Sequence, residues 1–219
     1  MKGIDILFED DTCAVLNKPS GLAVQGGEGI KTSLDYLLFK QWGQHPFLVH
    51  RLDKDTSGLL IVAKTREGAG FYGRLFKDKK ISRIYYAVCA GSPKNKSGTI
   101  EDNLEIRGIL KEARTSYRLL ASNGDFSLLE LELDTGRMHQ LRRHLAQIQS
   151  PVLGDDKYGS FPLNKKYRRE LDLKKLLLHA GHLKIADHRA DRVFKAPLPE
   201  YFSPFLEQLS IKGIPERID

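Results

Sequence analysis

The sequence predicts an α+β fold whose sheet is largely antiparallel. Many segments are short and rich in β-forming residues, few have helical periodicity, and strands do not alternate regularly with helices. Of the 219 residues, 41% are hydrophobic and 29% are charged, which is usual for a globular protein. A chain of this length buries one substantial core, so we expect a single domain over residues 1–219 with short helices and loops flanking the sheet.

The predicted strands are short and enriched in β-branched and aromatic residues. The first two, at residues 4–8 and 12–16, flank the turn E-D-D and are expected to form a hairpin. Further strands are expected at residues 59–64, 84–89, 115–121 and 126–133. The last two meet at S-N-G-D, a strong hairpin signal. The stretch S-P-K-N-K-S-G at residues 92–98 is expected to be a surface loop.

Helices are predicted where capping residues precede periodic apolar residues. Thr32 and Asp35 resemble a capping box that opens a helix through Trp42, and Thr65 is expected to cap a second helix that reaches about residue 76. After the turn T-G-R, one helical face gathers the apolar side chains Met138, Leu141, Leu145 and Ile148. The segment at residues 199–209 is a weaker helical prediction.

The chain is basic, with a formal net charge of +7 at pH 7. Two stretches concentrate this charge: residues 74–83 hold five basic residues against one Asp, and residues 164–175 hold six against two acids. A single charged run is usually a solvated surface. Two of them, together with R-M-H-Q-L-R-R, favour a face that binds phosphates, so nucleic acid is expected ahead of lipid as the anionic partner.

Cysteine usage and hydropathy bound the environment of the protein. Cys13 and Cys89 both lie in apolar segments, as is typical of reduced core thiols in a cytoplasmic protein without disulfides. The strongest apolar runs, such as residues 59–63, are too short to span a membrane. The N-terminal residues are acidic, and neither a signal peptide nor an anchor is visible.

Several enzyme classes fail on motif spacing. A phosphate loop requires adjacent Gly-Lys-Thr, but Ile30 separates Gly29 from Lys31. His139 and His144 are five residues apart, whereas helical metal ligands stand four apart, so no metal site is expected. A zinc base deaminase needs C-x-x-C, which a chain with two distant cysteines cannot supply.

The segment H-R-L-D-K-D-T-S-G at residues 50–58 places acidic residues before a five-residue apolar strand. Loops held by rigid strands often carry catalytic groups, and Asp53 or Asp55 would lie at the edge of a core. The same residues are ordinary turn formers ahead of Gly58. The residues alone leave both interpretations open.

H-R-L-D-K-D-T-S-G-L-L resembles the signature of the RluA family of pseudouridine synthases. The resemblance extends over approximately residues 4–200, through motifs that occur in the family's order: L-N-K-P-S-G-L-A-V, R-I-Y-Y-A, E-A-R-T-S-Y, T-G-R-M-H-Q-L-R-R-H-L, S-P-V-L-G-D-D-K-Y-G and L-L-L-H-A. Several ordered motifs are far more specific than any one of them. The resemblance implies one catalytic domain built around a central RNA-binding cleft.

The departures from the family pattern are mild. Arg83 stands where Lys is usual, Met138 where Thr is frequent, and Leu141 where Ile is commoner. The first family motif begins at Leu16, so we expect no N-terminal S4-type RNA-binding domain. RNA contacts would then come from the catalytic domain itself.

The resemblance implies that the protein isomerises uridine to pseudouridine in RNA without a cofactor. Asp53 matches the catalytic Asp, which either attacks as a nucleophile or takes a proton from the sugar. Arg142 matches the Arg that holds this Asp through a charge-assisted hydrogen bond. Tyr85 matches the active-site Tyr, which stacks on the uracil and lies where it can assist removal of the C5 proton.

His50 and Arg51 are expected to arrange the loop or contact the flipped nucleotide. Leu177, Leu178 and His179 are expected to be core and cleft wall. Further RNA contacts are expected from Arg137, His139, Gln140, Lys165, Lys166, Arg168 and Arg169.

The expected substrate is a compact RNA stem-loop, with ribosomal RNA favoured slightly over transfer RNA. No membrane association and no obligatory protein partner are expected, and the protein is expected to be a monomer. Two alternative functions are distinguished by the product that each would form. A catalytically silent RNA-binding or ribosome-assembly factor would bind RNA without forming product, and a hydrolytic glycosidase would release free uracil.

Overall fold

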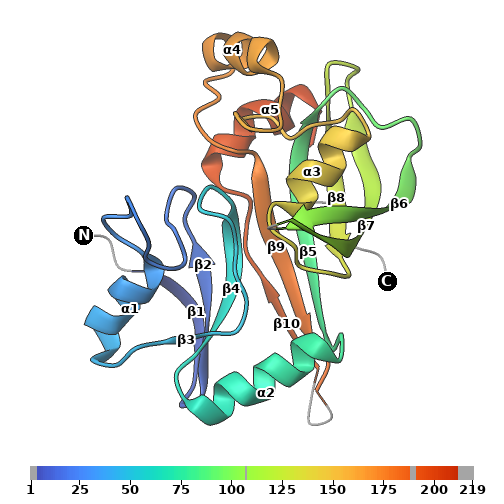
Figure 1. Ribbon diagram of the computed structural model, residues 1–219. Coiled ribbons are helices and arrows are strands. Elements are labelled where there is room, and N and C mark those ends of the chain that lie inside the picture. Colours follow the sequence, from blue (N-terminus) through green and yellow to red (C-terminus); the bar gives the residue numbers. More distant parts are fainter. Residues whose placement is uncertain (1–3, 107, 188–190, 212–219) are drawn as a thin grey trace. The chain divides into compact units, whose positions relative to one another are not determined.

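The computed structural model describes residues 4–106, 108–187 and 191–211 (Figure 1). The chain divides into two compact units, here called unit 1 (Met1–Arg83 and Ala180–Ala196) and unit 2 (Ile84–His179 and Pro197–Asp219). Strands β5 (Ile81–Ala90) and β9 (Leu178–Ile185) each contribute residues to both units.

In unit 1 the strand order is β1-β2-β4-β9, with β3 paired to β4 and β10 paired to β9. Its other strands are β1 (Asp5–Glu9), β2 (Cys13–Lys18), β3 (Phe47–Leu48), β4 (Ser57–Ala63) and β10 (Arg192–Lys195). The pairs β1–β2, β2–β4, β3–β4 and β9–β10 are antiparallel. Strand β4 lies between β2 and β9 in the sheet, and all seven of its residues are buried.

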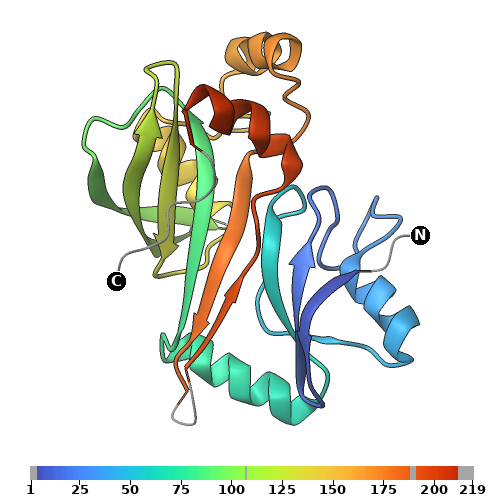
Figure 2. The ribbon, with the colours of Figure 1, turned by 180° about the vertical axis from the view of Figure 1, so that it is seen from behind.

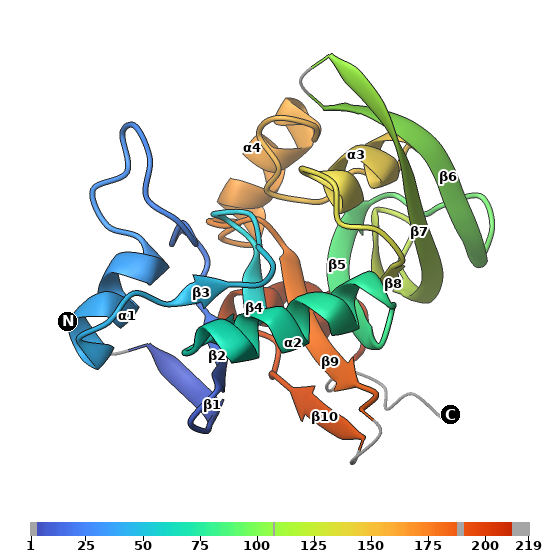
Figure 3. The same ribbon diagram turned by 60° about the horizontal axis from the view of Figure 1, so that its bottom comes forward.

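Helix α2 (Arg66–Lys77) runs along one face of the unit 1 strands (Figure 3). It begins where Thr65 Oγ1 accepts a hydrogen bond of 3.0 Å from the Gly68 N–H, as the capping prediction requires. Tyr72 projects from α2 into the core of this unit. That core comprises Cys13, Val15, Leu59, Ile61, Tyr72, Ile81, Leu183, Ile185 and Ala196.

Helix α1 (Leu34–Trp42) also belongs to unit 1, and the predicted cap at Thr32 is wrong. Ser33 is the N-cap residue, and its hydroxyl bonds the Asp35 carboxylate rather than a backbone N–H. The first helical N–H groups instead donate to backbone carbonyls at residues 23 and 24, which removes the need for a side-chain cap.

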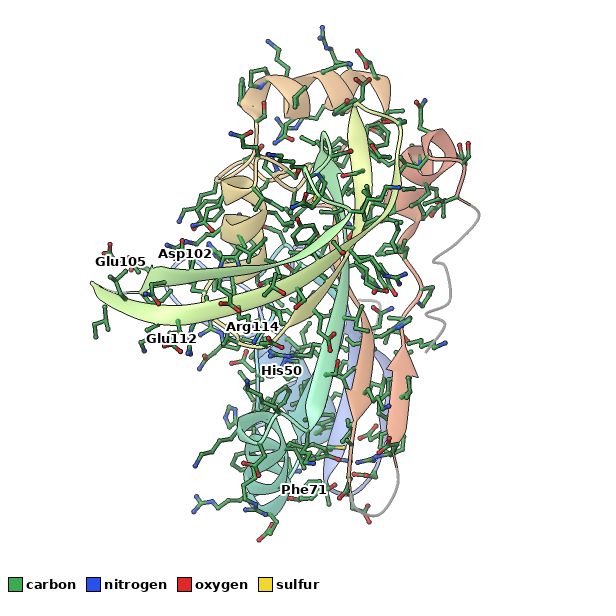
Figure 4. The ribbon with its side chains drawn as sticks, turned by 90° about the vertical axis from the view of Figure 1, so that its right-hand side faces the viewer. His50, Phe71, Asp102, Glu105, Glu112 and Arg114 are labelled. Carbon is green, nitrogen blue, oxygen red and sulfur yellow. The ribbon has the colours of Figure 1, made fainter. Side chains whose placement is uncertain are left out.

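Unit 2 contains the antiparallel order β5-β8-β7-β6. The strands are β6 (Ser97–Ile106), β7 (Ile109–Ser122) and β8 (Phe126–Leu133), besides the part of β5 from Ile84 onward. Strands β6 and β7 form a long hairpin that carries the labelled Asp102, Glu105, Glu112 and Arg114 (Figure 4). Helix α3 (Gln140–Gln147) packs against this hairpin, where Arg143 Nη1 donates to the Glu105 carbonyl oxygen at 3.1 Å.

The other helices of unit 2 are α4 (Phe161–Glu170), the 3₁₀ helix η1 (Glu200–Phe202) and α5 (Ser203–Gln208), the last two drawn in red in Figure 2. Aromatic edges join α4 and α5 to the start of β8. Phe126 meets Tyr167 at 5.6 Å and Phe205 at 5.5 Å between ring centroids, both edge to face. These contacts anchor the basic helix α4 to the sheet of unit 2.

The predicted α+β class with a largely antiparallel sheet is confirmed. The first hairpin and the hairpin at residues 122–125 are also confirmed, while β6, β9, β10 and α4 were not predicted. Residues 97 and 98, expected in a surface loop, begin β6. Both cysteines are buried and free. Among the described residues, no helix is long and apolar enough to cross a membrane.

Candidate active site

Asp53 lies in a tight turn immediately before β4. Its carbonyl oxygen accepts a hydrogen bond of 3.2 Å from the Thr56 N–H, which closes the turn over residues 53–56. Asp53 is half-buried, whereas Asp55 is exposed. The turn therefore gives the two acidic residues different surroundings although they are only two positions apart.

The turn leads into a glycine that no other residue can replace without strain. Gly58 has φ +107°, and a Cβ added there would lie 2.2 Å from the Ala180 carbonyl oxygen. Both the left-handed backbone and the close approach of β9 thus require glycine. Gly58 fixes how the chain passes from the Asp53 turn into the sheet.

The buried side chain of Lys18 ties the Asp53 turn to the end of β2. Its Nζ donates to three backbone carbonyl oxygens, those of Pro19 at 2.9 Å, Leu22 at 2.8 Å and Lys54 at 2.9 Å. The Lys54 carbonyl also accepts the Gly21 N–H at 2.9 Å. The residue that follows Asp53 is therefore held by two donors, one at the end of β2 and one in the loop that follows it.

Burial lowers the pKa of Lys18 to about 8, while the negative charges of Asp55 and Asp53 oppose that shift. All three N–H donors of the ammonium group are used, so the buried cation is satisfied. Lys18 is fully buried, and its ammonium group is directed into the fold rather than toward a ligand. We call these three hydrogen bonds the Lys18 clasp, because they hold the Asp53 turn against the end of β2.

His50 is held as a neutral ring. Its Nε2 accepts the Ile61 N–H at 2.9 Å, so the ring proton is on Nδ1. Burial and the nearby charge of Arg83 lower the pKa of His50 to about 3. The ring packs against Phe76 with 4.7 Å between centroids. Arg51, the next residue, is exposed.

In unit 2 Arg142 projects from α3 and forms a buried ion pair with Asp155. Arg142 Nε donates to Oδ2 of Asp155 at 2.7 Å, and Nη2 donates to Oδ1 at 2.8 Å. Both residues are buried. The two parallel hydrogen bonds fix the plane of the guanidinium group, which a single contact could not do.

Gln140 organises the loop that precedes α3. Its Oε1 accepts from the Thr135 hydroxyl at 2.7 Å and from the Arg137 N–H at 3.0 Å. Its Nε2 donates to the Arg114 carbonyl at 2.8 Å and to Thr115 Oγ1 at 3.0 Å. This buried amide uses both of its donors and both of its acceptor positions within the protein.

His139 lies in the left-handed region with φ +54°, directly before α3. Its Nδ1 lies 3.0 Å from the Tyr158 hydroxyl, and the two rings meet edge to face. The Arg142 guanidinium lies over the same tyrosine ring, 5.2 Å from its centroid. Tyr158 thus links the loop before α3 to the arginine on α3.

Tyr85 is 3% exposed and lies opposite Leu131 in the β5–β8 pair. The side chains of Tyr85 and Tyr86 alternate across the strand, as successive β residues do. Leu177, Leu178 and His179 are also buried, in agreement with the expectation that they belong to the core.

The basic residues that were predicted to contact RNA lie on α4, and two of them already pair with acidic side chains. Arg168 Nη2 contacts Asp156 at 2.6 and 2.8 Å, and Lys166 Nζ lies 3.8 Å from Asp125. Lys165 and Arg169 are exposed on the same helix. Fewer basic side chains of α4 are therefore available to phosphates than the number of its basic residues indicates.

A family model described as RNA pseudouridylate synthase matches residues 12–147. The chain belongs to this family. It is 37% identical over 215 residues to "Ribosomal large subunit pseudouridine synthase C" of Rickettsia prowazekii (strain Madrid E), covering 90% of this chain and 69% of the relative. It is 36% identical over 230 residues to "Ribosomal large subunit pseudouridine synthase D" of Borreliella burgdorferi, covering 93% and 68%.

The fold agrees with solved pseudouridine synthase structures. "Human RNA Pseudouridylate Synthase Domain Containing 4" aligns with a TM-score of 0.78 and 26% identity, covering 94% of this chain and 93% of that one. "Human RNA Pseudouridylate Synthase Domain Containing 1" shares the fold, with a TM-score of 0.72 and 23% identity. The protein is a pseudouridine synthase, as the sequence motifs predicted.

The predicted site residues of this pseudouridine synthase are distributed between the two units. His50, Arg51 and Asp53 belong to unit 1, while unit 2 holds Tyr85, Arg137, His139, Gln140, Arg142, Lys165, Lys166, Arg168 and Arg169. Sequence reasoning assigned no role to Lys18 or Asp155, although both lie in quoted motifs. A lysine at the end of a strand whose first four residues, Cys13–Leu16, are apolar was the signal for Lys18. Among the described residues, no three His, Cys, Asp or Glu side chains are placed to hold a metal.

Proposed function

We propose that this protein converts specific uridines in structured RNA to pseudouridine, with ribosomal RNA favoured over transfer RNA and Asp53 as the catalytic residue. The relatives named as ribosomal large subunit pseudouridine synthases support the choice of RNA. The observation that carries the choice of residue is the clasped turn at Asp53. Lys18 and Gly21 donate hydrogen bonds to the carbonyl oxygen of Lys54, the residue after Asp53, and so hold the turn in place. The half-buried Asp53 is thereby presented from a rigid backbone.

The reaction breaks the C1′–N1 bond of uridine, turns the uracil, joins C1′ to C5, removes the C5 proton and returns a proton to N1. No atom is gained or lost, and no oxidation occurs, so the chemistry needs no cofactor. An Asp53 carboxylate serves either by attacking the nucleotide or by taking a proton from the sugar. Both routes require that its oxygens be aimed at the ribose and uracil, which the clasped turn favours.

We assign Arg142 and Tyr85 to the same reaction, with residues 1–219 acting as one catalytic domain. Arg142 aligns the Asp53 carboxylate through a charge-assisted hydrogen bond. Tyr85 stacks on the uracil, and its hydroxyl assists removal of the C5 proton. The fixed plane of Arg142 supports the first role, because alignment of a carboxylate depends on the orientation of its partner.

RNA contacts are proposed for Arg51, Arg137 and His139, and for the basic residues of α4, while His50, predicted to arrange the loop or contact the nucleotide, is better assigned to arranging the loop because its Nε2 accepts the Ile61 N–H. Gln140 is better assigned to positioning, since its buried amide bonds only to protein atoms in the contacts described above. The target nucleotide must leave its stack to be reached, which suits the loop of a compact stem-loop. A monomer is proposed as the active form.

The test compares wild type, Asp53→Asn and Asp55→Asn with large-subunit ribosomal RNA as substrate, measuring pseudouridine formed and RNA affinity. We expect Asp53→Asn to lose at least ~10⁴-fold in rate with little change in affinity. Asp55→Asn, the matched control two residues away, should retain most activity. Turnover by Asp53→Asn would overturn the assignment, and equal losses would show that the two acids are not distinguished.

A second measurement identifies the RNA. Pseudouridines are mapped in total RNA from cells with and without the gene, and we expect a site to disappear from ribosomal RNA. Loss from transfer RNA alone would overturn the preference for ribosomal RNA. Loss of no site would favour a silent RNA-binding factor, and release of free uracil in vitro would indicate a glycosidase.

A further inference from the structure

The loop G-D-D-K-Y-G at residues 154–159 has no role in the reaction described above, yet its backbone is tightly specified. Gly154 has φ +81°, and a Cβ there would lie 2.2 Å from the Lys175 carbonyl oxygen. At Gly159 a Cβ would lie 2.2 Å from the Asp155 carbonyl oxygen. The side chain of Asn164 on α4 closes the loop, accepting the Gly154 N–H at 3.0 Å and donating to the Asp155 carbonyl at 3.1 Å.

The centre of this loop is the carboxylate of Asp155, whose residue is 1% exposed. Its Oδ1 accepts the backbone N–H groups of Lys157 at 2.9 Å and Tyr158 at 3.0 Å, in addition to Nη2 of Arg142. Burial acts to raise the pKa of Asp155, but the hydrogen bonds from Arg142 and the backbone outweigh it and the pKa is lowered. The carboxylate is therefore ionised under assay conditions.

The loop holds Arg142 from two directions. Asp155 takes the Nε–H and one N–H of Nη2, and the Tyr158 ring lies 5.2 Å below the guanidinium carbon. A guanidinium group has five N–H donors in one plane, so this grip sets the direction of every donor, those on Nη1 included. The position of Arg142 is determined by a loop that follows its helix in sequence.

We propose that Asp155 is a positioning residue that orients the guanidinium of Arg142 for the reaction, an inference that rests on the proposed function. Asp155 touches neither the uracil nor the ribose in this scheme and acts only through Arg142. It also balances the positive charge of a buried arginine. A loss of Asp155 should therefore slow the chemical step and leave RNA binding nearly intact.

Asp156 provides a matched control in the same loop. Its side chain is 65% exposed and bonds Arg168 on the surface at 2.6 Å. Asp155→Asn and Asp156→Asn make the same chemical change at adjacent positions, one buried against Arg142 and one solvated. A general effect of loop charge would lower both activities alike, whereas positioning of Arg142 would affect only Asp155.

The experiment measures single-turnover rates at saturating enzyme, RNA affinity and thermal unfolding for both variants, for Arg142→Ala and for Arg142→Ala/Asp155→Asn. We expect Asp155→Asn to lose ~10²-fold in rate with affinity within about threefold, and Asp156→Asn to stay near wild type in rate. In the double variant, the Asp155 change should add no further loss, because its only target is already absent. A normal rate in folded Asp155→Asn, or losses that multiply in the double variant, would overturn the proposal.

A second variant covers the case in which Asp155→Asn does not fold. Arg142→Lys keeps the charge beside an intact Asp155 but cannot form the two parallel bonds, and we expect at least a tenfold slower chemical step. A wild-type rate in Arg142→Lys would contradict the need for a fixed guanidinium plane. Wild-type enzyme that forms no pseudouridine would instead refute the proposed function, so the two failures are distinguishable.

Discussion

Lys18 Nζ donates a hydrogen bond of 2.9 Å to the carbonyl oxygen of Lys54, the residue that directly follows Asp53. The contact joins two sequence motifs 36 residues apart through a side chain and a backbone group. It helps to explain why a lysine is buried at the end of β2, because its ammonium group bonds backbone carbonyl oxygens instead of water. The position of the proposed catalytic turn therefore depends in part on Lys18.

Replacing Lys18 by Met should destabilise the protein and slow catalysis. The change leaves three backbone carbonyls without this donor, and we expect the free energy of unfolding to fall by about 3 kcal/mol. The single-turnover rate should fall by ~10-fold or more, because the Asp53 turn loses its clasp. Lys54→Ala is the control: the contact uses its backbone carbonyl, so its exposed side chain should be dispensable. Denaturant unfolding and single-turnover rates measure both variants. Equal losses in Lys18→Met and Lys54→Ala would contradict the proposed role of the Lys18 hydrogen bonds.

Gly58→Ala should cost more stability than any surface glycine change. The new Cβ would meet the Ala180 carbonyl at 2.2 Å and would force a positive φ on alanine, so we expect a loss of about 3 kcal/mol or more. Gly73→Ala on α2 is the matched control, because nothing lies within 4 Å of its added Cβ and alanine favours helices. Chemical denaturation of the two variants should therefore give shifts of opposite sign.

His50→Gln should make the protein less sensitive to acid. The folded-state pKa of His50 is lowered to about 3, whereas the unfolded ring has an ordinary value near 6.5. Between these values the unfolded state binds more protons, so the His50 contribution to stability is present above pH ~6.5 and is lost as the pH falls toward 3. Unfolding free energies at several pH values should show a shallower decline for His50→Gln than for wild type. An unchanged slope would mean that His50 is not held neutral.

Tyr85→Phe should slow the chemical step and preserve RNA affinity. The ring needed for stacking remains, while the hydroxyl proposed to assist removal of the C5 proton is absent. We expect a rate loss of ~10² in single-turnover experiments with saturating enzyme. Tyr86→Phe, at the neighbouring position on the opposite face of β5, serves as the control. A normal rate at saturation with weaker binding would assign Tyr85 to RNA affinity instead.

The sequence predicted the fold best where burial and periodicity agree. Strand β8 was located at its observed bounds, Phe126–Leu133, because most of its residues are buried and S-N-G-D marks its hairpin. Strand β6 was missed because its residues are mostly exposed, with only Ile100 and Leu104 buried, so no alternating apolar pattern reveals it. Helix α4 was missed for a related reason, since its buried residues are only Asn164 and Tyr167.

The position of Asp53 in a turn before an apolar strand was predictable from the sequence, whereas its catalytic role comes from the family resemblance and stays a prediction. The contacts of Lys18 and Asp155 were not predictable, because they depend on tertiary neighbours. Lys18 binds carbonyl oxygens that belong to two separate loops, and Asp155 is defined by an arginine 13 residues earlier in the chain. Motif spacing gives the positions of such residues along the chain, but their contacts are seen only in the folded structure.

The two basic stretches should contribute unequally to RNA binding. On α4, Arg168 and Lys166 have acidic neighbours at Asp156, Asp125 and Glu170. Near the end of α2 the side chains of Arg74, Lys77, Lys79 and Lys80 are exposed, and no ion pair involves them among the described residues. Cations already paired with carboxylates release fewer counterions when they meet phosphates. The α2 set therefore has more charge available for RNA.

The test neutralises four residues at a time, by changing Arg74, Lys77, Lys79 and Lys80 to Gln in one variant and Lys165, Lys166, Arg168 and Arg169 in the other. Both should weaken binding, since removal of one cation that binds a phosphate lowers the slope of log K against log salt by about 0.7 to 0.9. We expect the α2 variant to lose a few units of slope and the α4 variant fewer. Binding measured across a salt series decides it. A larger loss from the α4 variant would show that its ion pairs open on binding, and equal, salt-independent losses would indicate that neither stretch meets the phosphate backbone.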